Sequence, residues 1–294
     1  MRKTSVYLPE DLKDELAALA RRSSRSEAEL LRLAVERLVQ SARDDAPPNP
    51  SARPRVTGPR LTGVGVGPSD PGLVTERAIA TLREADRVFA PSTGPDAIGR
   101  AEAIVRAVAP EVRVDRLVLD VGADPLARAA ALAAAADVII EALDTGAVVA
   151  FVTLGDPNVF STFPALARLV AERRPSAPVA TIPGVMAFQA LAAQAGTVLA
   201  EDGEHVAVIV ADPDSAELDA LLDDPGCTVV VYKGGRHLPS VANRLRAHDR
   251  MAGAVVGEML GLAGGRCVDV ESVADQPASY LATIVIPATR GVMP

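Results

Sequence analysis

The strongest constraint on the fold is a buried strand that runs directly into a glycine turn and then a helix. Val148 to Leu154 is an uninterrupted apolar run, Gly155-Asp156-Pro157 follows as a turn, and the pattern predicts an amphipathic helix over Phe163–Glu172. In open α/β sheets such a turn exposes backbone N–H groups that a ligand can approach. The alternative is an ordinary strand-turn-helix corner, in which Asp156 and Pro157 supply only turn chemistry.

The same order of elements recurs across residues 56–175, which we expect to form one α/β domain. Strands are expected from Arg60, at 87–91, 112–119 and 148–154, and helices at 74–84, from Pro95-Asp96 to Val108, from an Asp124 N-cap to Leu143, and at 163–172. Alternating strands and helices predict a mostly parallel sheet with helices on both faces.

A short break at Pro175–Pro178 is a candidate boundary, and residues 176–294 are expected to form a second α/β domain of a different build. Strands are predicted at 179–182, 206–211 and 228–232, with helices at 216–222 and 238–247. The stretches 254–259 and 280–287 are strand-rich without clear helices, so antiparallel pairing and a mixed second sheet are expected.

Composition excludes several classes of protein. The net charge of −8 argues against nucleic-acid binding by the whole chain, although it permits a small basic module. Two distant cysteines and three scattered histidines match no disulfide or metal-ligand spacing, so we expect no metal. No apolar run reaches the length of a membrane span, and the start of the chain lacks the apolar core of a signal peptide. We therefore expect a cytoplasmic protein without membrane attachment.

Residues 1–43 form a separate unit, followed by a proline-rich linker at 44–55. A short alternating strand is predicted at 3–8, a helix at 10–22, and a second helix after Ser26, which with Glu29 forms a capping box. One strand and two short helices cannot close a core alone, so the unit is expected to dimerise.

This unit resembles the ribbon-helix-helix family of DNA-binding proteins, over residues 2–40, through the stretches Thr4–Leu12 and Ser26–Arg32. In that family a two-stranded ribbon from the dimer enters the major groove. The resemblance implies that Lys3, Ser5 and Tyr7 face the bases and that the start of the second helix meets phosphate. A dimerisation unit without DNA binding is the alternative, because nearby acidic residues weaken the positive field.

The glycine-rich loop after the first strand of residues 56–175 does not fit the nucleotide-binding templates. In G-x-G-x-x-G the sixth position would be Pro68 when counted from Gly63, or Asp70 when counted from Gly65. No Gly-Lys-Ser/Thr follows the loop, which also excludes a Walker loop.

Four turns instead match another family in order: Gly63–Pro71, Leu154–Phe163, Ile182–Phe188 and Val231–His237. Together they resemble the tetrapyrrole (corrin/porphyrin) methyltransferases, which use S-adenosylmethionine. Within the family the pattern is most similar to the members that methylate precorrin-2 at C20 in cobalamin biosynthesis. The chain departs from the pattern at Ser69, where glycine is usual, and we expect a cost in φ there.

The resemblance implies a two-domain methylase fold and a homodimer, with the cofactor in the cleft between the domains. The residues that it implies for S-adenosylmethionine binding are Pro68, Leu154, Gly155, Asp156, Phe160, Ser161, Thr162, Met186, Ala187, Ala211 and Lys233. For the carboxylates of the tetrapyrrole substrate we expect Lys233, Arg236 and His237. Methyl transfer to carbon needs in-line positioning more than strong acids or bases, and no catalytic residue is identified.

Three alternatives stay open. Metal-free precorrin-2 and cobalt-precorrin-2 differ by an ion that no motif reveals. A methylase of the same family could act at another ring position. The chain could also be a DNA-binding regulator whose α/β portion only senses S-adenosylmethionine or a corrinoid precursor.

Overall fold

The chain divides into two compact units, one ending at Thr57 and the other beginning at Gly58. The computed structural model describes residues 9–23, 25–44, 58–119, 125–212, 216–262 and 264–290. The strand expected at 3–8, with Lys3, Ser5 and Tyr7, and nearly all of the expected linker lie outside the described residues.

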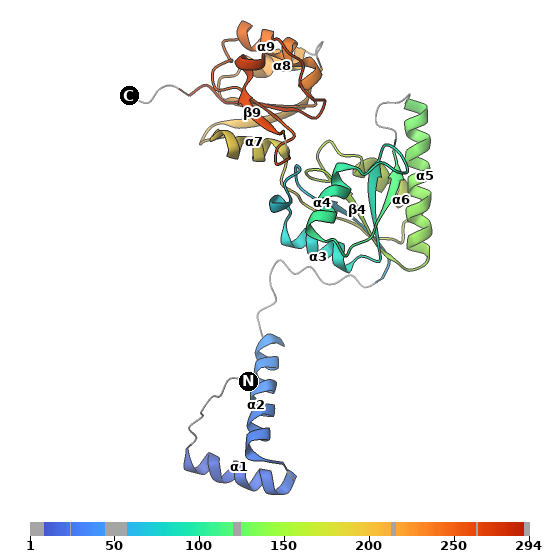
Figure 1. Cartoon of the computed structure of the whole chain (residues 1–294), viewed down its shortest axis with the longest axis vertical. Coiled ribbons are helices and arrows are strands. Elements are labelled where there is room, and N and C mark those ends of the chain that lie inside the picture. The colour runs from blue at the N-terminus through green and yellow to red at the C-terminus, as the bar shows by residue number, and fades with distance from the viewer. Residues whose placement is uncertain are drawn as a thin grey trace. The chain divides into compact units, whose positions relative to one another are not determined.

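The N-terminal unit contains two helices, α1 (Glu10–Ser23) and α2 (Glu27–Asp44), as predicted (Figure 1). The Ser26 Oγ accepts a hydrogen bond from the Glu29 N–H at 3.2 Å, which confirms Ser26 as the cap of α2. Leu12 and Leu19 are 48% and 44% exposed, and no side chain whose exposure is described in this unit is buried. The described part of the unit therefore has no core of its own.

The first sheet of the larger unit is fully parallel, in agreement with the mostly parallel sheet that the sequence predicts. Its order is β3-β2-β4-β1-β5, and its strands are β1 (Arg60–Gly65), β2 (Arg87–Ser92), β3 (Val114–Val118), β4 (Val148–Thr153) and β5 (Val179–Ile182). The sheet extends past the boundary expected between residues 175 and 176, because β5 pairs in parallel with β1. The first sheet therefore takes its last strand from beyond the Pro175–Pro178 break.

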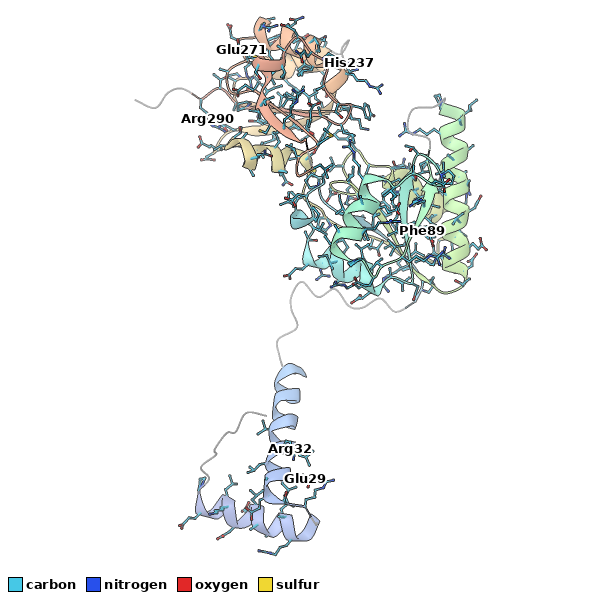
Figure 2. All side chains as sticks on the ribbon, viewed as in Figure 1. Glu29, Arg32, Phe89, His237, Glu271 and Arg290 are labelled. Carbon is cyan, nitrogen blue, oxygen red and sulfur yellow. The ribbon has the colours of Figure 1, made fainter. Side chains whose placement is uncertain are left out.

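Helices cover both faces of this sheet, because apolar side chains alternate along its central strands. On β4, Ala150 and Val152 pack against α3 (Glu76–Glu84) and α4 (Arg100–Val108). Val149 and Phe151 face the other way, toward α5 (Pro125–Asp144) and α6 (Phe163–Arg173). Figure 2 shows Phe89 of β2 within the side chains of this second core.

Helix α4 begins five residues later than the Pro95-Asp96 start that the sequence predicts. Gly99 is its N-cap, and a Cβ at this position would lie 2.5 Å from the Pro91 carbonyl oxygen. Close packing of Gly99 against β2 thus sets where the helix begins. The predicted Asp124 cap lies outside the described residues, and α5 begins at Pro125.

The second sheet is mixed, with the order β6-β7-β10-β8-β9. Its strands are β6 (His205–Val210), β7 (Cys227–Tyr232), β8 (Val255–Glu258), β9 (Arg266–Asp269) and β10 (Thr283–Ile286). Only β6 and β7 pair in parallel, so the expected antiparallel pairing of the last part of the chain is confirmed by β8 and β10.

Helices also cover both faces of the second sheet. Helices α8 (Ala216–Leu222) and α9 (Leu238–Ala247) pack on one face, and α7 (Ala187–Ala195) packs on the other. Within the described ranges, none of the helices combines the length and the hydrophobicity that crossing a bilayer requires.

Candidate functional site

Three glycines meet at the carboxyl ends of three neighbouring strands of the first sheet, β4, β1 and β5. Gly65 ends β1, Gly155 follows β4, and Gly184 follows β5. A Cβ on Gly65 would lie 2.4 Å from the Gly155 carbonyl oxygen, and one on Gly184 would lie 2.2 Å from the same atom. Gly155 has a φ of 62°, which favours glycine. Backbone therefore contacts backbone here with no room for side chains.

Hydrogen bonds hold this glycine cluster in place. The Gly155 N–H donates to the Gly67 carbonyl at 2.9 Å. The two carboxylate oxygens of Asp156 accept from the backbone N–H groups of Asn158, at 2.8 Å, and Gly184, at 3.2 Å. Asp156 thus ties the turn after β4 to the connection between β5 and α7.

The end of β7 contributes side chains rather than backbone. The Tyr232 ring makes edge-on contacts with Phe160 and Phe188, at centroid distances of 6.0 and 6.4 Å. Its hydroxyl accepts from the Phe188 N–H at 3.5 Å near the start of α7. Burial raises the pKa of the Tyr232 phenol, so the hydroxyl stays protonated at neutral pH.

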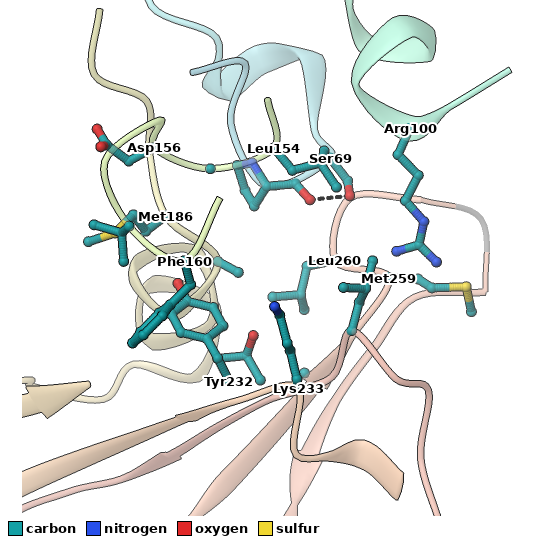
Figure 3. Close-up of a pocket in the computed structure, with 17 residues that line it drawn as sticks. Ser69, Arg100, Leu154, Asp156, Phe160, Met186, Tyr232, Lys233, Met259 and Leu260 are labelled. Atoms are coloured by element: carbon teal, nitrogen blue, oxygen red, sulfur yellow. Dashed lines mark hydrogen bonds between the residues drawn. The ribbon is translucent and has the colours of Figure 1, made fainter. Parts of the chain in front are cut away.

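A cavity opens between these two sets of residues (Figure 3). Its walls come from both sheets of the larger unit, and its lining is mainly apolar. The lining residues are Pro68, Ser69, Arg100, Leu154, Gly155, Asp156, Val159, Phe160, Met186, Ala187, Tyr232, Lys233, Gly257, Met259, Leu260, Leu281 and Thr283. A concave, mostly apolar site with a few polar groups is typical of small-molecule binding.

Unusual backbone conformations concentrate at this cavity. Four non-glycine residues among those described have a positive φ, and three of them line it: Phe160 at 46°, Lys233 at 58° and Met259 at 46°. Such conformations cost about 1 kcal/mol or more each and cluster at functional sites. Their position supports this cavity as the candidate site.

Two cations and one carboxylate line the cavity. Asp156 is held by the two backbone N–H groups named above, whereas Lys233 and Arg100 form no ion pair with any described residue. Figure 3 shows the Lys233 side chain extending into the cavity from the end of β7 and the Arg100 side chain descending from the start of α4. The cavity can therefore accept an anionic ligand.

The structure brings most of the predicted cofactor residues to this one cavity. They are Pro68, Leu154, Gly155, Asp156, Phe160, Met186, Ala187 and Lys233. Seven of them come from the first three turns that the sequence singles out, and Lys233 comes from the fourth.

Ser161 and Thr162, by contrast, do not line the cavity. The Ser161 Oγ donates to the Pro157 carbonyl at 2.6 Å and accepts from the Phe163 N–H at 3.1 Å. Thr162 is the N-cap of α6. The two hydroxyl residues therefore stand where the turn ends and the helix begins, and the Ser161 hydroxyl is engaged there by backbone groups.

Ala211, Arg236 and His237 also lie outside it. Ala211 and His237 line a second, smaller cavity beside α9, and Ala211 follows β6, which is the edge strand of the second sheet. Arg236 is exposed and lies over the Tyr280 ring at 5.2 Å. Of the three residues expected at the substrate carboxylates, only Lys233 lines the main cavity.

Sequence reasoning missed about half of the lining. Tyr232 and Val159 stand inside quoted turns, so this signal could have identified both. Ser69 enters the sequence analysis only as a departure from the family pattern; it is buried, and it is not among the described residues with positive φ, so the expected cost in φ is absent. The other missed lining residues lie outside the four turns: Arg100, Gly257, Met259, Leu260, Leu281 and Thr283.

Two family models match the chain. The model described as Tetrapyrrole (Corrin/Porphyrin) Methylases matches residues 60–272, and the model described as ribbon-helix-helix protein, copG family, matches residues 2–40. The two matches fall on the two units of the structure, one on each. The residues between the matches, 41–59, include the position between Thr57 and Gly58 at which the units divide.

Similar proteins agree with the first match. A precorrin-2 C(20)-methyltransferase of Sinorhizobium sp is 29% identical over 242 residues, which is 79% of this chain and 96% of that protein. A cobalt-precorrin-2 C(20)-methyltransferase of Salmonella typhimurium is 28% identical over 236 residues, or 77% of this chain and 95% of the relative. The crystal structure of a cobalt precorrin-4 methyltransferase has a TM-score of 0.60 at 19% identity, covering 79% of this chain and 96% of that one, which shows the shared fold.

Proposed function

This chain belongs to the tetrapyrrole (corrin/porphyrin) methylases, and we propose that it transfers a methyl group from S-adenosylmethionine to C20 of precorrin-2. The product would be precorrin-3A, an intermediate of cobalamin biosynthesis. Similarity to both metal-free and cobalt-dependent relatives leaves cobalt-precorrin-2 as the alternative substrate.

The glycine contacts at Gly65, Gly155 and Gly184 carry this assignment. Of the three, Gly155 lines the cavity, and its close contacts with Gly65 and Gly184 fix the position of a stretch of backbone that a ligand can approach at a residue without a side chain. Ala187 adds a small side chain, and Leu154 and Met186 add apolar surface beside it. A flat adenine ring and a short methionine chain fit a wall of this kind, so these residues would hold S-adenosylmethionine.

The protein's part in the reaction is to position the two reactants. Bound S-adenosylmethionine supplies a methyl group on a positively charged sulfur, and the electron-rich tetrapyrrole carbon is its acceptor. The rings of Phe160 and Tyr232 line the cavity and would orient the ligands by contact with their flat surfaces. Lys233 holds a carboxylate of the substrate. The Tyr232 hydroxyl is not assigned the role of a base, because burial raises its pKa still further above neutral pH.

The decisive assay is incubation of the full chain with labelled S-adenosylmethionine and enzymatically prepared precorrin-2, metal-free and cobalt-loaded in parallel. Mass spectrometry of the products should show one added methyl group, and comparison of the two reactions identifies the preferred substrate. Cofactor binding without transfer to either form would contradict the proposal and favour another ring position or a sensor.

For the N-terminal unit we infer a ribbon-helix-helix homodimer that binds DNA. Two observations support this inference: the family match over residues 2–40 and the absence of a buried side chain among those assessed in α1 and α2. Two copies would bury the exposed apolar side chains, including Leu12 and Leu19, against each other.

Light scattering and selection from a random DNA library test this second activity. The full chain should be dimeric and should enrich a defined sequence, and a variant lacking residues 1–45 should lose the enrichment. A dimer that enriches no DNA sequence would mean that the N-terminal unit serves dimerisation and does not bind a specific sequence. Methylation that survives the truncation would show that the two activities are separable.

A further inference from the structure

We propose that Arg100 binds a carboxylate of the tetrapyrrole substrate and that Lys233 binds another. Arg100 comes from α4, which packs on the first sheet, and Lys233 directly follows β7 of the second sheet. This assignment rests on the proposed function and adds a residue that none of the recognised turns contains. Arg100 lines the main cavity together with Lys233, and it also lines the small cavity that Ser69, Ala103, Ile104 and Leu262 complete.

The position of Arg100 is set by packing that has nothing to do with its charge. It is the first residue of α4, directly after the Gly99 cap, where a Cβ would meet the Pro91 carbonyl at 2.5 Å. The buried Glu102 then anchors the same turn to β3 through Arg116, with contacts of 2.7 and 2.9 Å. The start of α4, and with it the base of the Arg100 side chain, is therefore rigidly held.

The charge of Arg100 is unfavourable for the protein alone. A cation in the first turn of a helix opposes the helix dipole, which favours acidic residues there, at a cost of some tenths of a kcal/mol. The nearest acid on the helix, Glu102, already pairs with Arg116 and Arg106, at 2.7 and 2.6 Å. Arg100 has no ion pair with any residue in the described ranges, and it is half-buried. An anionic ligand in the cavity would provide the Arg100 guanidinium with an ion-pair partner.

The ligand chemistry that fits is a carboxylate. A guanidinium presents paired donors that match the two oxygens of a carboxylate, and an ammonium such as that of Lys233 binds a carboxylate as a point charge. Two ligands of the proposed reaction carry carboxylates: the tetrapyrrole, which has several, and the methionine part of the cofactor, which has one. The separation of two cations on different elements favours the ligand with several carboxylates.

Arg100→Gln, Arg100→Lys and the control Arg128→Gln in the full chain test this assignment. Arg128 is an exposed arginine of α5 that does not line the cavity. Precorrin-2 binding is measured by equilibrium dialysis in the presence of S-adenosylhomocysteine, and S-adenosylhomocysteine binding is measured separately by calorimetry. Neither measurement depends on turnover, so a failure of methylation does not obscure the result.

Arg100→Gln should weaken precorrin-2 binding about ten- to hundredfold and leave S-adenosylhomocysteine affinity within about twofold, because one charged hydrogen-bonded contact is lost. Arg100→Lys should recover part of the affinity, and Arg128→Gln should match the unaltered chain. Unchanged precorrin-2 affinity in Arg100→Gln would overturn the proposal. So would an equal loss of S-adenosylhomocysteine affinity, which would assign the cation to the cofactor carboxylate or to the fold.

Discussion

The two walls of the cavity are built from different parts of the polypeptide. The first sheet contributes the turn after β4, where Gly155 lines the cavity. Gly65 and Gly184 pack against this turn so closely that added Cβ atoms on them would lie 2.4 and 2.2 Å from the Gly155 carbonyl oxygen. The second sheet contributes side chains, such as Tyr232 and Lys233 at the end of β7. The first wall is therefore built around a backbone turn that leaves no room for added side chains, whereas the second is built mainly from side chains.

This difference indicates a division of work between the walls. A backbone wall can change very little without disturbing the strands that form it, so it suits a ligand that stays the same. A wall of side chains can change by substitution alone, so it suits selection among related substrates. In the proposed reaction the constant ligand is S-adenosylmethionine and the variable one is the tetrapyrrole.

The largest effect should come from adding a methyl group to the backbone wall. In Gly184→Ala the new Cβ would lie 2.2 Å from the Gly155 oxygen and 2.8 Å from the Gly65 carbonyl carbon, so β1 and the two turns must separate. We expect a loss of about 3 kcal/mol or more in unfolding free energy, together with loss of S-adenosylhomocysteine binding. Urea denaturation and calorimetry measure the two.

Gly94→Ala is the matched control, because its added Cβ would meet only the Ala97 Cβ at 4.0 Å and Gly94 is not at positive φ. Its stability should change by less than about 1 kcal/mol. A stable Gly184→Ala variant that still binds the cofactor analogue would contradict the idea of a backbone wall.

The same difference explains what could be predicted from the sequence. The backbone wall requires glycine at fixed places after strands, and that requirement is visible as Gly-Val-Gly-Val-Gly, Gly-Asp-Pro and Pro-Gly. The family resemblance that rests on these turns assigns Pro68, Gly155 and Met186 to one site, and they line one cavity. The parallel first sheet was readable too, because apolar strands alternate regularly with helices.

The part of the cavity that the second sheet forms depends on strand order, which local patterns do not reveal. Gly257 and Thr283 line the cavity because β8 and β10 are neighbours inside the second sheet. Ala211 does not, because β6 is at the edge. Periodicity identifies each of these segments as a strand, but only long-range pairing decides which strand ends meet the cavity.

A smaller effect is expected at Glu102, which holds the helix that carries Arg100. The Arg116 guanidinium hydrogen-bonded to Glu102 lowers the pKa of this buried carboxyl below its ordinary value of 4.5. The stabilisation is therefore present above about pH 4.5 and is lost as the pH falls through the lowered pKa. Glu102→Gln should cost about 2 kcal/mol at pH 7, measured by urea denaturation.

The pH dependence separates this ion pair from ordinary packing. The difference in stability between the unaltered chain and Glu102→Gln should shrink as the pH is lowered below 4.5. Glu111→Gln is the control, since Glu111 pairs with Arg83 at the surface, where both side chains are more than half exposed. A Glu102→Gln penalty that is constant with pH would mean that shape, and not charge, holds α4.

The smallest effect should come from the hydroxyl of Tyr232 on the wall of side chains. Tyr232→Phe keeps both ring contacts and removes an oxygen whose hydrogen bond to the Phe188 N–H is long, at 3.5 Å. The expected change is about 0.5 kcal/mol in stability and less than about threefold in S-adenosylhomocysteine affinity. Tyr232→Ala removes the ring from between Phe160 and Phe188 and should cost about 3 kcal/mol. If Tyr232→Phe and Tyr232→Ala lost equal amounts of stability and of S-adenosylhomocysteine affinity, the hydroxyl would be the important group. Tyr232 would then act through its hydroxyl and not through the packing of its ring.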